Sequence, residues 1–176
     1  MRNLFRAAIL ACLVSPMCLG GSVSRDQKKA SQARPTGIEV EMVQFDEIKL
    51  PTEFQVAIYE NLIRQLQENG RFENVYRDGD RNATEHPDTI VLHCTVTGFK
   101  QGSERARQVT TVAGATSMIV HCRFTDANGR ALLERDIQGK VRFFGGNLKA
   151  TYDFAKKAAG VAREVSIEQS PRTASL

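Results

Sequence analysis

The chain has 176 residues, of which 41% are hydrophobic and 25% are charged. This composition is ordinary for a globular protein, so it excludes a disordered chain and a protein with several membrane spans. The formal net charge is +4, but the basic residues are scattered along the chain. Such scatter does not favour nucleic-acid binding, which needs a basic surface on one face.

The N-terminus has the layout of a secretory signal peptide. Arg2 and Arg6 precede an apolar run from Ala7 to Leu19, and small residues follow up to Ser24. The run is too short for a comfortable transmembrane helix, so we expect export and cleavage after Ser24. Removal of residues 1–24 leaves 22 of the 24 basic residues beside 20 acidic ones.

Lipidation of Cys12 or Cys18 is the alternative fate of this segment. Neither cysteine has a good lipidation sequence, because Met17 stands where a small residue is needed and the apolar run before Cys12 is short. The expected location is the periplasm or the periphery of the outer membrane. Residues 25–36 are polar and predict a flexible leader, residues 37–167 predict a single domain, and residues 168–176 predict a disordered tail.

The first half of the domain predicts a strand, a helix and a short strand. In the stretch GIEVEMVQF (37–45), Ile38, Val40 and Met42 alternate with the other residues and predict one buried face. Thr52 and Gln55 form a potential capping box at the start of a helix that ends near Gly70. Its apolar stripe is Phe54, Ile58, Leu62 and Leu66. A short strand, RFENVY (71–76), and a polar loop follow.

The second half predicts three long strands and a last helix. Each of the first two strands contains a His-Cys pair, at 93–94 and 121–122, with the cysteines on the apolar face. Asp126 to Gly129 (DANG) predict a tight turn into a strand over 131–141. Gly145 and Gly146 break the chain before a helix that Asn147 is expected to cap. The predicted apolar stripe of this helix is Leu148, Tyr152, Ala155, Ala159 and Ala162.

This order of elements predicts an α+β fold. We expect a two-layer sandwich in which two helices pack on a mainly antiparallel sheet of about five strands.

The two His-Cys pairs do not predict a zinc site, because neighbouring residues of a strand point to opposite faces of the sheet. A hairpin centred near Gln108 would instead place Cys94 opposite Cys122, within the distance that a disulfide needs. Two interpretations are open: a disulfide formed in an oxidising compartment, or two buried free thiols.

The sequence contains no recognisable catalytic constellation. It lacks a Gly-x-Ser-x-Gly elbow, and no cofactor or metal motif is complete. A non-enzymatic envelope protein is therefore the favoured function. A small hydrolase that acts on cell-wall material through carboxylates distant in sequence is the alternative.

The stretch from Gly102 to Met118 (GSERARQVTTVAGATSM) joins two predicted strands and is rich in small residues. It is not a phosphate-binding loop, since a strand and not a helix follows its last glycine. The small residues 113–116 are expected to pass close to another backbone, such as the break at Gly145 and Gly146. Two interpretations are open: a plain connection, or a basic loop of Lys100, Arg105 and Arg107 that contacts an anionic envelope component.

The same region resembles the bacterial envelope family known as domain of unknown function 4410. The similarity extends over about 37–165 and is most specific between 95 and 146. Its positions are Gly102, Ser103 and Arg107; Ala113, Gly114 and Ala115; Asp126, Ala127 and Gly129; Gly145 and Gly146. The resemblance implies an exported α+β domain with no established catalytic residues. Its expected partner is an envelope protein, a lipid or a cell-wall component, with peripheral membrane association and without nucleic acid.

Overall fold

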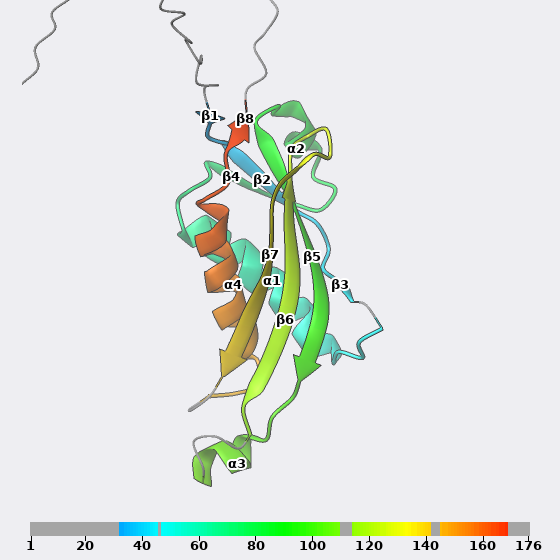
Figure 1. Cartoon of the computed structure of the whole chain (residues 1–176), viewed down its shortest axis with the longest axis vertical. Helices are drawn as coiled ribbons and strands as arrows, with labels where there is room; N and C mark the ends of the chain where they lie inside the picture. Colours follow the sequence, from blue (N-terminus) through cyan, green and yellow to red (C-terminus); the bar gives the residue numbers. More distant parts are fainter. Residues whose placement is uncertain (1–31, 46, 110–113, 142–144, 169–176) are drawn as a thin grey trace, which may run out of the picture.

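A computed structural model describes residues 32–45, 47–109, 114–141 and 145–168 of the chain (Figure 1). The predicted signal peptide, both of its cysteines and the last eight residues lie outside this part. No helix among the described residues has the length and apolar character needed to cross a membrane.

The fold is α+β, as predicted, and the described residues form four helices and a six-stranded mixed sheet. The strands of this sheet are β2 (Gly37–Val40), β3 (Gln44–Phe45), β4 (Asn74–Arg77), β5 (Thr89–Lys100), β6 (Thr116–Thr125) and β7 (Ala131–Val141). Their order is β4-β2-β5-β6-β7, and β3 also pairs with β5. The pairs β5–β6 and β6–β7 are antiparallel, whereas β2 runs parallel to both of its neighbours.

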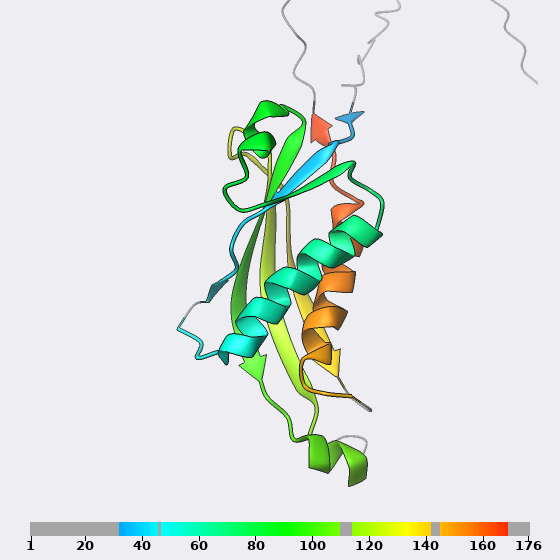
Figure 2. The ribbon, with the colours of Figure 1, turned by 180° about the vertical axis from the view of Figure 1, so that it is seen from behind.

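Two long helices lie side by side on one face of the sheet (Figure 2). They are α1 (Thr52–Glu68) and α4 (Lys149–Ala162). The sequence does not predict the two short helices, α2 (Arg81–Glu85) in the polar loop and α3 (Glu104–Val109) between β5 and β6. We call the face under α1 and α4 the covered face and the opposite one the free face.

A small second sheet joins the two ends of the described chain. It consists of β1 (Gln32–Ala33) and β8 (Ile167–Glu168), which pair antiparallel. Strand β1 therefore lies within the segment that was predicted to be a flexible leader. Both strands lie at one end of the long axis, and α3 lies at the other (Figure 1).

The predicted strand over 37–45 is interrupted. The five residues from Val40 to Gln44 run beside only four residues of β5, Leu92 to Thr95, so one residue is extra. This insertion reverses the alternation of side chains after Val40. Met42, predicted to be buried, is therefore 58% exposed, and Val43 takes its place in the core.

Helix α1 buries the predicted stripe, and Phe54, Ile58, Leu62 and Leu66 are fully buried. Its predicted capping box is absent. Pro51 is the N-cap without a side-chain hydrogen bond, and the Gln55 side chain donates to the Leu50 carbonyl.

Helix α4 is rotated relative to the prediction. Ala155, Ala159 and Ala162 are buried as expected, but Leu148 and Tyr152 are about 40% exposed. The helix buries Phe154 in their place. The reason lies in the sheet: a Cβ atom on Gly139 of β7 would come within 2.3 Å of the Ala150 carbonyl oxygen and 2.7 Å of Phe154 Cβ. Glycine at this position lets α4 settle directly on β7.

The β6–β7 turn forms where the sequence predicts it. One carboxylate oxygen of Asp126 accepts hydrogen bonds from the backbone of Asn128 and Arg130. Gly129 adopts a φ of 77°, a conformation that favours glycine. These contacts make Asp126 and Gly129 structural turn residues.

Candidate functional site

The basic residues singled out in the sequence lie at a projecting end of the molecule. Strands β5 and β6 lead to α3, which extends beyond the ends of the other strands (Figure 1). We call residues 100–109 and 114–116 the tip. Lys100 and Arg105 are exposed there, and neither forms an ion pair with a described residue. Arg107 lies in α3, but its side chain is outside the described part.

Hydrogen bonds hold the base of the tip to the start of α4. The backbone N–H of Gly102 donates to Thr116 Oγ1 (3.0 Å), and the Thr116 hydroxyl donates to Asn147 Oδ1 (2.7 Å). The Asn147 N–H then donates to Glu104 Oε1 (3.0 Å). Thr116 is fully buried. The prediction that Asn147 caps α4 is therefore wrong, because its side chain binds Thr116.

The tip also depends on a close backbone contact. A Cβ atom on Gly102 would lie 1.9 Å from the Gly114 carbonyl oxygen, so only glycine fits. The small-residue segment was expected to pass close to another backbone, and it does, although the backbone that Gly114 meets is that of Gly102 and not the suggested break at Gly145 and Gly146. The residue after the break, Asn147, is linked to this region through the side chains of Thr116 and Glu104.

The six predicted loop and turn residues fall into two groups. Gly102 and Gly114 lie in the tip, and Gly145 and Gly146 precede α4 at its base. Asp126 and Gly129 lie at the opposite end of β6. The structure thus brings four of the six together around the tip.

A second candidate site is a groove on the free face, with a volume of about 450 Å³. Its lining is mostly polar: Glu41, Met42, Gln44, His93, Cys94, Thr95, His121, Arg123 and Glu134. Several charged or titratable side chains of the groove are paired with a side chain of the neighbouring strand. Arg123 Nε lies 3.1 Å from Glu134 Oε1, and His121 Nδ1 lies 2.8 Å from Asp136 Oδ1.

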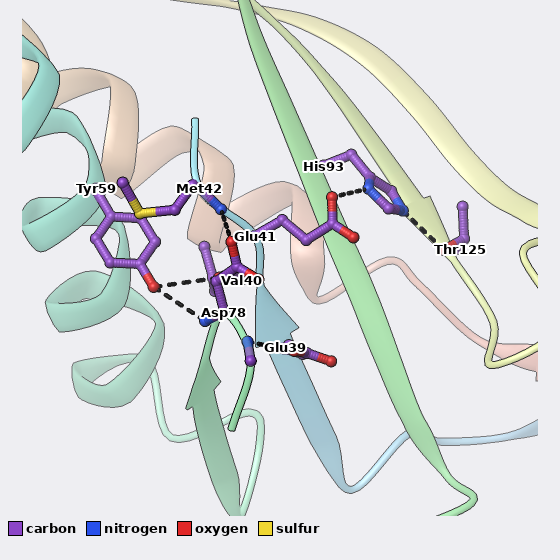
Figure 3. Close-up of polar contacts among 9 residues, drawn as sticks. Glu39, Val40, Glu41, Met42, Tyr59, Asp78, His93 and Thr125 are labelled. Atoms are coloured by element: carbon purple, nitrogen blue, oxygen red, sulfur yellow. Dashed lines mark hydrogen bonds and ion pairs between the residues drawn. The ribbon is translucent and has the colours of Figure 1, made fainter. Parts of the chain in front are cut away.

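His93 connects three strands at one side of the groove (Figure 3). Its Nδ1 lies 2.6 Å from Glu41 Oε2, and its Nε2 lies 3.1 Å from Thr125 Oγ1. This order of carboxylate, imidazole and hydroxyl is also that of a catalytic triad. Thr125 is only 3% exposed, however, so its hydroxyl is not open to a substrate. The arrangement ties β5 to β6 and to the end of β2.

The sequence places His93, His121 and Arg123 on the outward face but does not predict the groove. The signal that identifies it is the strand register. Once β5 and β6 are aligned, His93 pairs with Arg123 and Thr95 with His121. The alignment of β6 with β7 then adds Glu134 and Asp136. This combination depends on three strands and is not visible in any one motif.

Cys94 and Cys122 are direct register partners, as predicted. Their sulfur atoms lie 3.4 Å apart and are not bonded, and both residues are buried on the covered face. The hydrogen bond between the two side chains, together with burial, raises the pKa of the Cys94 thiol. A disulfide between them stays a prediction.

Solved structures share this fold at low sequence identity. Two structures of the PelC dodecamer from Paraburkholderia phytofirmans superpose with TM-scores of 0.56 and 0.55, at 13% and 14% identity. Each match covers 74% of this chain and 88% or 89% of the PelC chain. A minor lipoprotein from Acinetobacter baumannii gives a TM-score of 0.44 at 12% identity, over 76% of this chain and 98% of that one. No curated protein matches the sequence.

The family comparison gives a direct assignment. The matching family model is described as a domain of unknown function, and the match extends over residues 21–145. It includes the tip, the β6–β7 turn and all six strands of the main sheet, and it ends before α4. The predicted resemblance to this family is thus confirmed, and the chain belongs to the family DUF4410.

Proposed function

We propose that this protein is a non-enzymatic binding domain of the cell envelope, and that its tip binds an anionic envelope component. The observation that carries the proposal is the exposure of Lys100 and Arg105 at the projecting end of the molecule. Arg77, Arg123, Arg130, Arg135 and Lys157, by contrast, each pair with a carboxylate on the body of the domain. Exposed cations that have no ion-pair partner among the described residues are available to an anionic ligand, and the tip presents two of them, Lys100 and Arg105, in one short segment at an end of the molecule.

The structure of the tip supports this role. The hydrogen bonds through Thr116 and Asn147 fix its base, so the two cations are presented on a supported scaffold. Glu104, the acidic residue beside Arg105, accepts a hydrogen bond from the Asn147 N–H. A fixed base lowers the entropy lost on binding.

The β7 edge, one of the two edges of the main sheet, is a less suitable binding surface. Edge strands recruit partners through unpaired backbone groups. On β7 the Lys140 N–H donates to Asp153 Oδ2 (2.9 Å), and Lys157 Nζ donates to the Gln138 carbonyl (2.8 Å). Side chains of α4 therefore already occupy part of this edge.

Hydrolysis by two carboxylates is less well supported. Glu41 and Glu134 both line the groove, but Glu41 is hydrogen-bonded to His93 and Glu134 is paired with Arg123. A glycosidase needs one carboxyl group as a proton donor and a second one as base or nucleophile. Neither of these carboxylates is free of a basic partner.

The test compares two sources of negative charge. Protein purified from the envelope of producing cells is mixed with phosphatidylglycerol vesicles, with phosphatidylcholine vesicles, or with purified cell-wall sacculi, and the bound fraction is measured by sedimentation. Near an anionic surface, each cation contributes about 1 kcal/mol. Lys100→Gln with Arg105→Gln should therefore weaken binding roughly 30-fold, and added salt should weaken binding of the unmodified protein.

The matched control is Arg81→Gln with Lys156→Gln, which removes the same charge from α2 and α4. Both residues are exposed, and this variant should bind like the unmodified protein. Binding to phosphatidylglycerol alone identifies a lipid headgroup, and binding to sacculi alone identifies a cell-wall polymer. Equal losses in the tip variant and the control would contradict the proposal, as would no binding to either material.

A further inference from the structure

We propose that Cys94 and Cys122 form a disulfide while the chain folds in an oxidising compartment, and that the folded domain then keeps the oxidation state in which it folded. The proposal is independent of what the tip binds. It has two parts: the geometry that allows the bond, and the burial that stops later exchange.

The geometry requires only a small adjustment. The two cysteines are directly opposed on β5 and β6, and their sulfur atoms are 3.4 Å apart. A disulfide shortens this separation to about 2.05 Å, and rotation of the side chains can supply a change of this size. The backbone does not need to change its register. Directly opposed residues of an antiparallel pair already lie at a Cα separation that a disulfide accepts.

The register itself is well determined around the pair. Leu92 and Val96 flank Cys94 and are fully buried, and Val120 and Phe124 do the same for Cys122. A shift by one residue would move all of these side chains to the free face. The same burial that stabilises the core therefore holds the two thiols opposite each other.

Burial separates the pair from reagents once the domain has folded. Cys94 is 2% exposed and Cys122 is fully buried, within the core shared by the sheet, α1 and α4. Cys94 borders the groove of the free face. Its side chain nevertheless points to the covered face, where its sulfur lies 3.4 Å from that of Cys122. In thiol–disulfide exchange, a thiolate must reach a sulfur atom of the disulfide. The buried sulfur atoms of Cys94 and Cys122 can take part only when α1 and α4 move away from the sheet.

The acid–base state of the thiols acts in the same direction. Exchange proceeds through the thiolate. The hydrogen bond to Cys122 and burial both raise the pKa of the Cys94 thiol, which keeps it protonated at neutral pH. The folded reduced domain is thus both inaccessible and poorly nucleophilic.

The bond must then form before α1 and α4 close over the sheet. The thiolate of one cysteine attacks a disulfide-containing oxidant of the envelope: a mixed disulfide forms, the S–S bond of the oxidant breaks, and its other sulfur leaves as a thiolate that takes up a proton. The second cysteine then attacks the mixed disulfide, the Cys94–Cys122 bond forms, and the first sulfur of the oxidant leaves in the same way, so two electrons and two protons pass to the oxidant. The hairpin of β5 and β6 brings together residues only 28 positions apart, a local contact that can form early.

The experiment folds the full chain in two ways and compares the products. A Cys12→Ala, Cys18→Ala chain, which retains only the two buried cysteines, is synthesised without cells, either with glutathione disulfide or with dithiothreitol. Peptide mass mapping should find a Cys94–Cys122 linked peptide in the first product and two alkylatable thiols in the second. The oxidised product should melt about 5–15 °C higher, since a disulfide stabilises by limiting the unfolded chain.

The second part of the proposal is tested on the folded products. Dithiothreitol added to the oxidised protein, and glutathione disulfide added to the reduced one, should each react at least about 100-fold more slowly than in urea. Cys122→Ala is the matched control, and its melting temperature should be the same after either synthesis. If this variant fails to fold, Cys94→Ala serves the same purpose.

Two results would overturn the proposal. Free thiols at both positions after oxidative synthesis would show that the pair does not close. Interconversion of the native proteins as fast as in urea would show that the core does not protect the pair, and the oxidation state would then be reversible in the folded domain.

Discussion

The two faces of the sheet use the same strands in different ways. On the covered face, Ile90, Leu92 and Val96 of β5 are fully buried under α1 and α4. On the free face, the same strand carries His93 and Thr95, which border a polar groove. Polar side chains of neighbouring strands pair there, and they are partly exposed. The side chains of His121 and Asp136, for example, are 41% and 68% exposed.

This difference separates the source of stability from the available chemistry. Burial of apolar side chains contributes roughly 25 cal/mol per Å², whereas an exposed ion pair contributes about 0–1 kcal/mol. The covered face should therefore dominate the free energy of unfolding. The exposed side chains of the free face and of the tip, such as Lys100 and Arg105, should tolerate substitution.

The largest effect is expected from a deletion on the covered face. Phe154 is fully buried where α4 meets Gly139, and Phe154→Ala removes a ring and leaves a cavity. We expect a loss of about 3–5 kcal/mol in the free energy of unfolding, measured by urea denaturation.

The matched substitution on the free face is Ile119→Ala, because Ile119 is 40% exposed. It should cost less than about 1.5 kcal/mol, since a partly exposed side chain has less buried surface to lose than Phe154 and leaves no enclosed cavity. Equal losses in the two variants would contradict the distinction between the faces.

A smaller effect is expected where helix and sheet edge meet. Asp153 accepts from the Lys140 N–H and pairs with Lys157 at 2.7 Å. Asp153→Ala should cost about 1–2 kcal/mol and expose the edge of β7 to other chains. Light scattering should then show more concentration-dependent association than the unmodified protein does.

Asp153→Asn is the control for this edge, because its amide oxygen can still accept from Lys140. It should associate less than Asp153→Ala does. If neither variant associates more than the unmodified protein at high concentration, the side chains of α4 do not protect the edge.

The covered face was largely predictable from the sequence. Alternation of apolar residues in 89–99 and 117–125 identifies its buried side chains, and the position of the connection gives the pairing of Cys94 with Cys122. The family was predictable as well, because its glycine-rich segments lie close together in the chain. Both kinds of information are local in sequence.

The features that were mispredicted depend on distant residues. Asn147 is of a residue type that often caps helices, but its side chain accepts a hydrogen bond from Thr116 of β6 instead. Met42 continues an alternating pattern in the sequence. The pairing of β3 with β5, however, leaves one extra residue between β2 and β3, so Met42 lies on the free face. The groove needs the alignment of several strands. In each case a tertiary contact overrides a local preference that is only weakly determined.

The smallest effect concerns an exposed ion pair between α1 and β4. Arg77 donates two hydrogen bonds to Glu60, at 2.7 and 2.8 Å, and both side chains are about half exposed. The hydrogen bond from Arg77 lowers the pKa of Glu60 below its ordinary value of 4.5. A carboxylate with a lowered pKa in the folded state stabilises the fold above its unfolded pKa and loses that contribution as pH falls through the folded pKa.

Glu60→Gln should therefore cost about 0.5 kcal/mol or less at pH 7, because water screens so exposed a pair. The difference from the unmodified protein should begin to shrink below pH 4.5, where Glu60 of the unfolded chain takes up a proton, and should disappear once the pH has fallen through the lowered pKa of folded Glu60. Urea denaturation of both proteins at pH 7 and at pH 3.5 measures this change. A cost that exceeds 1.5 kcal/mol, or that persists at the lower pH, would mean that exposed charges contribute to the fold on the scale of the buried face.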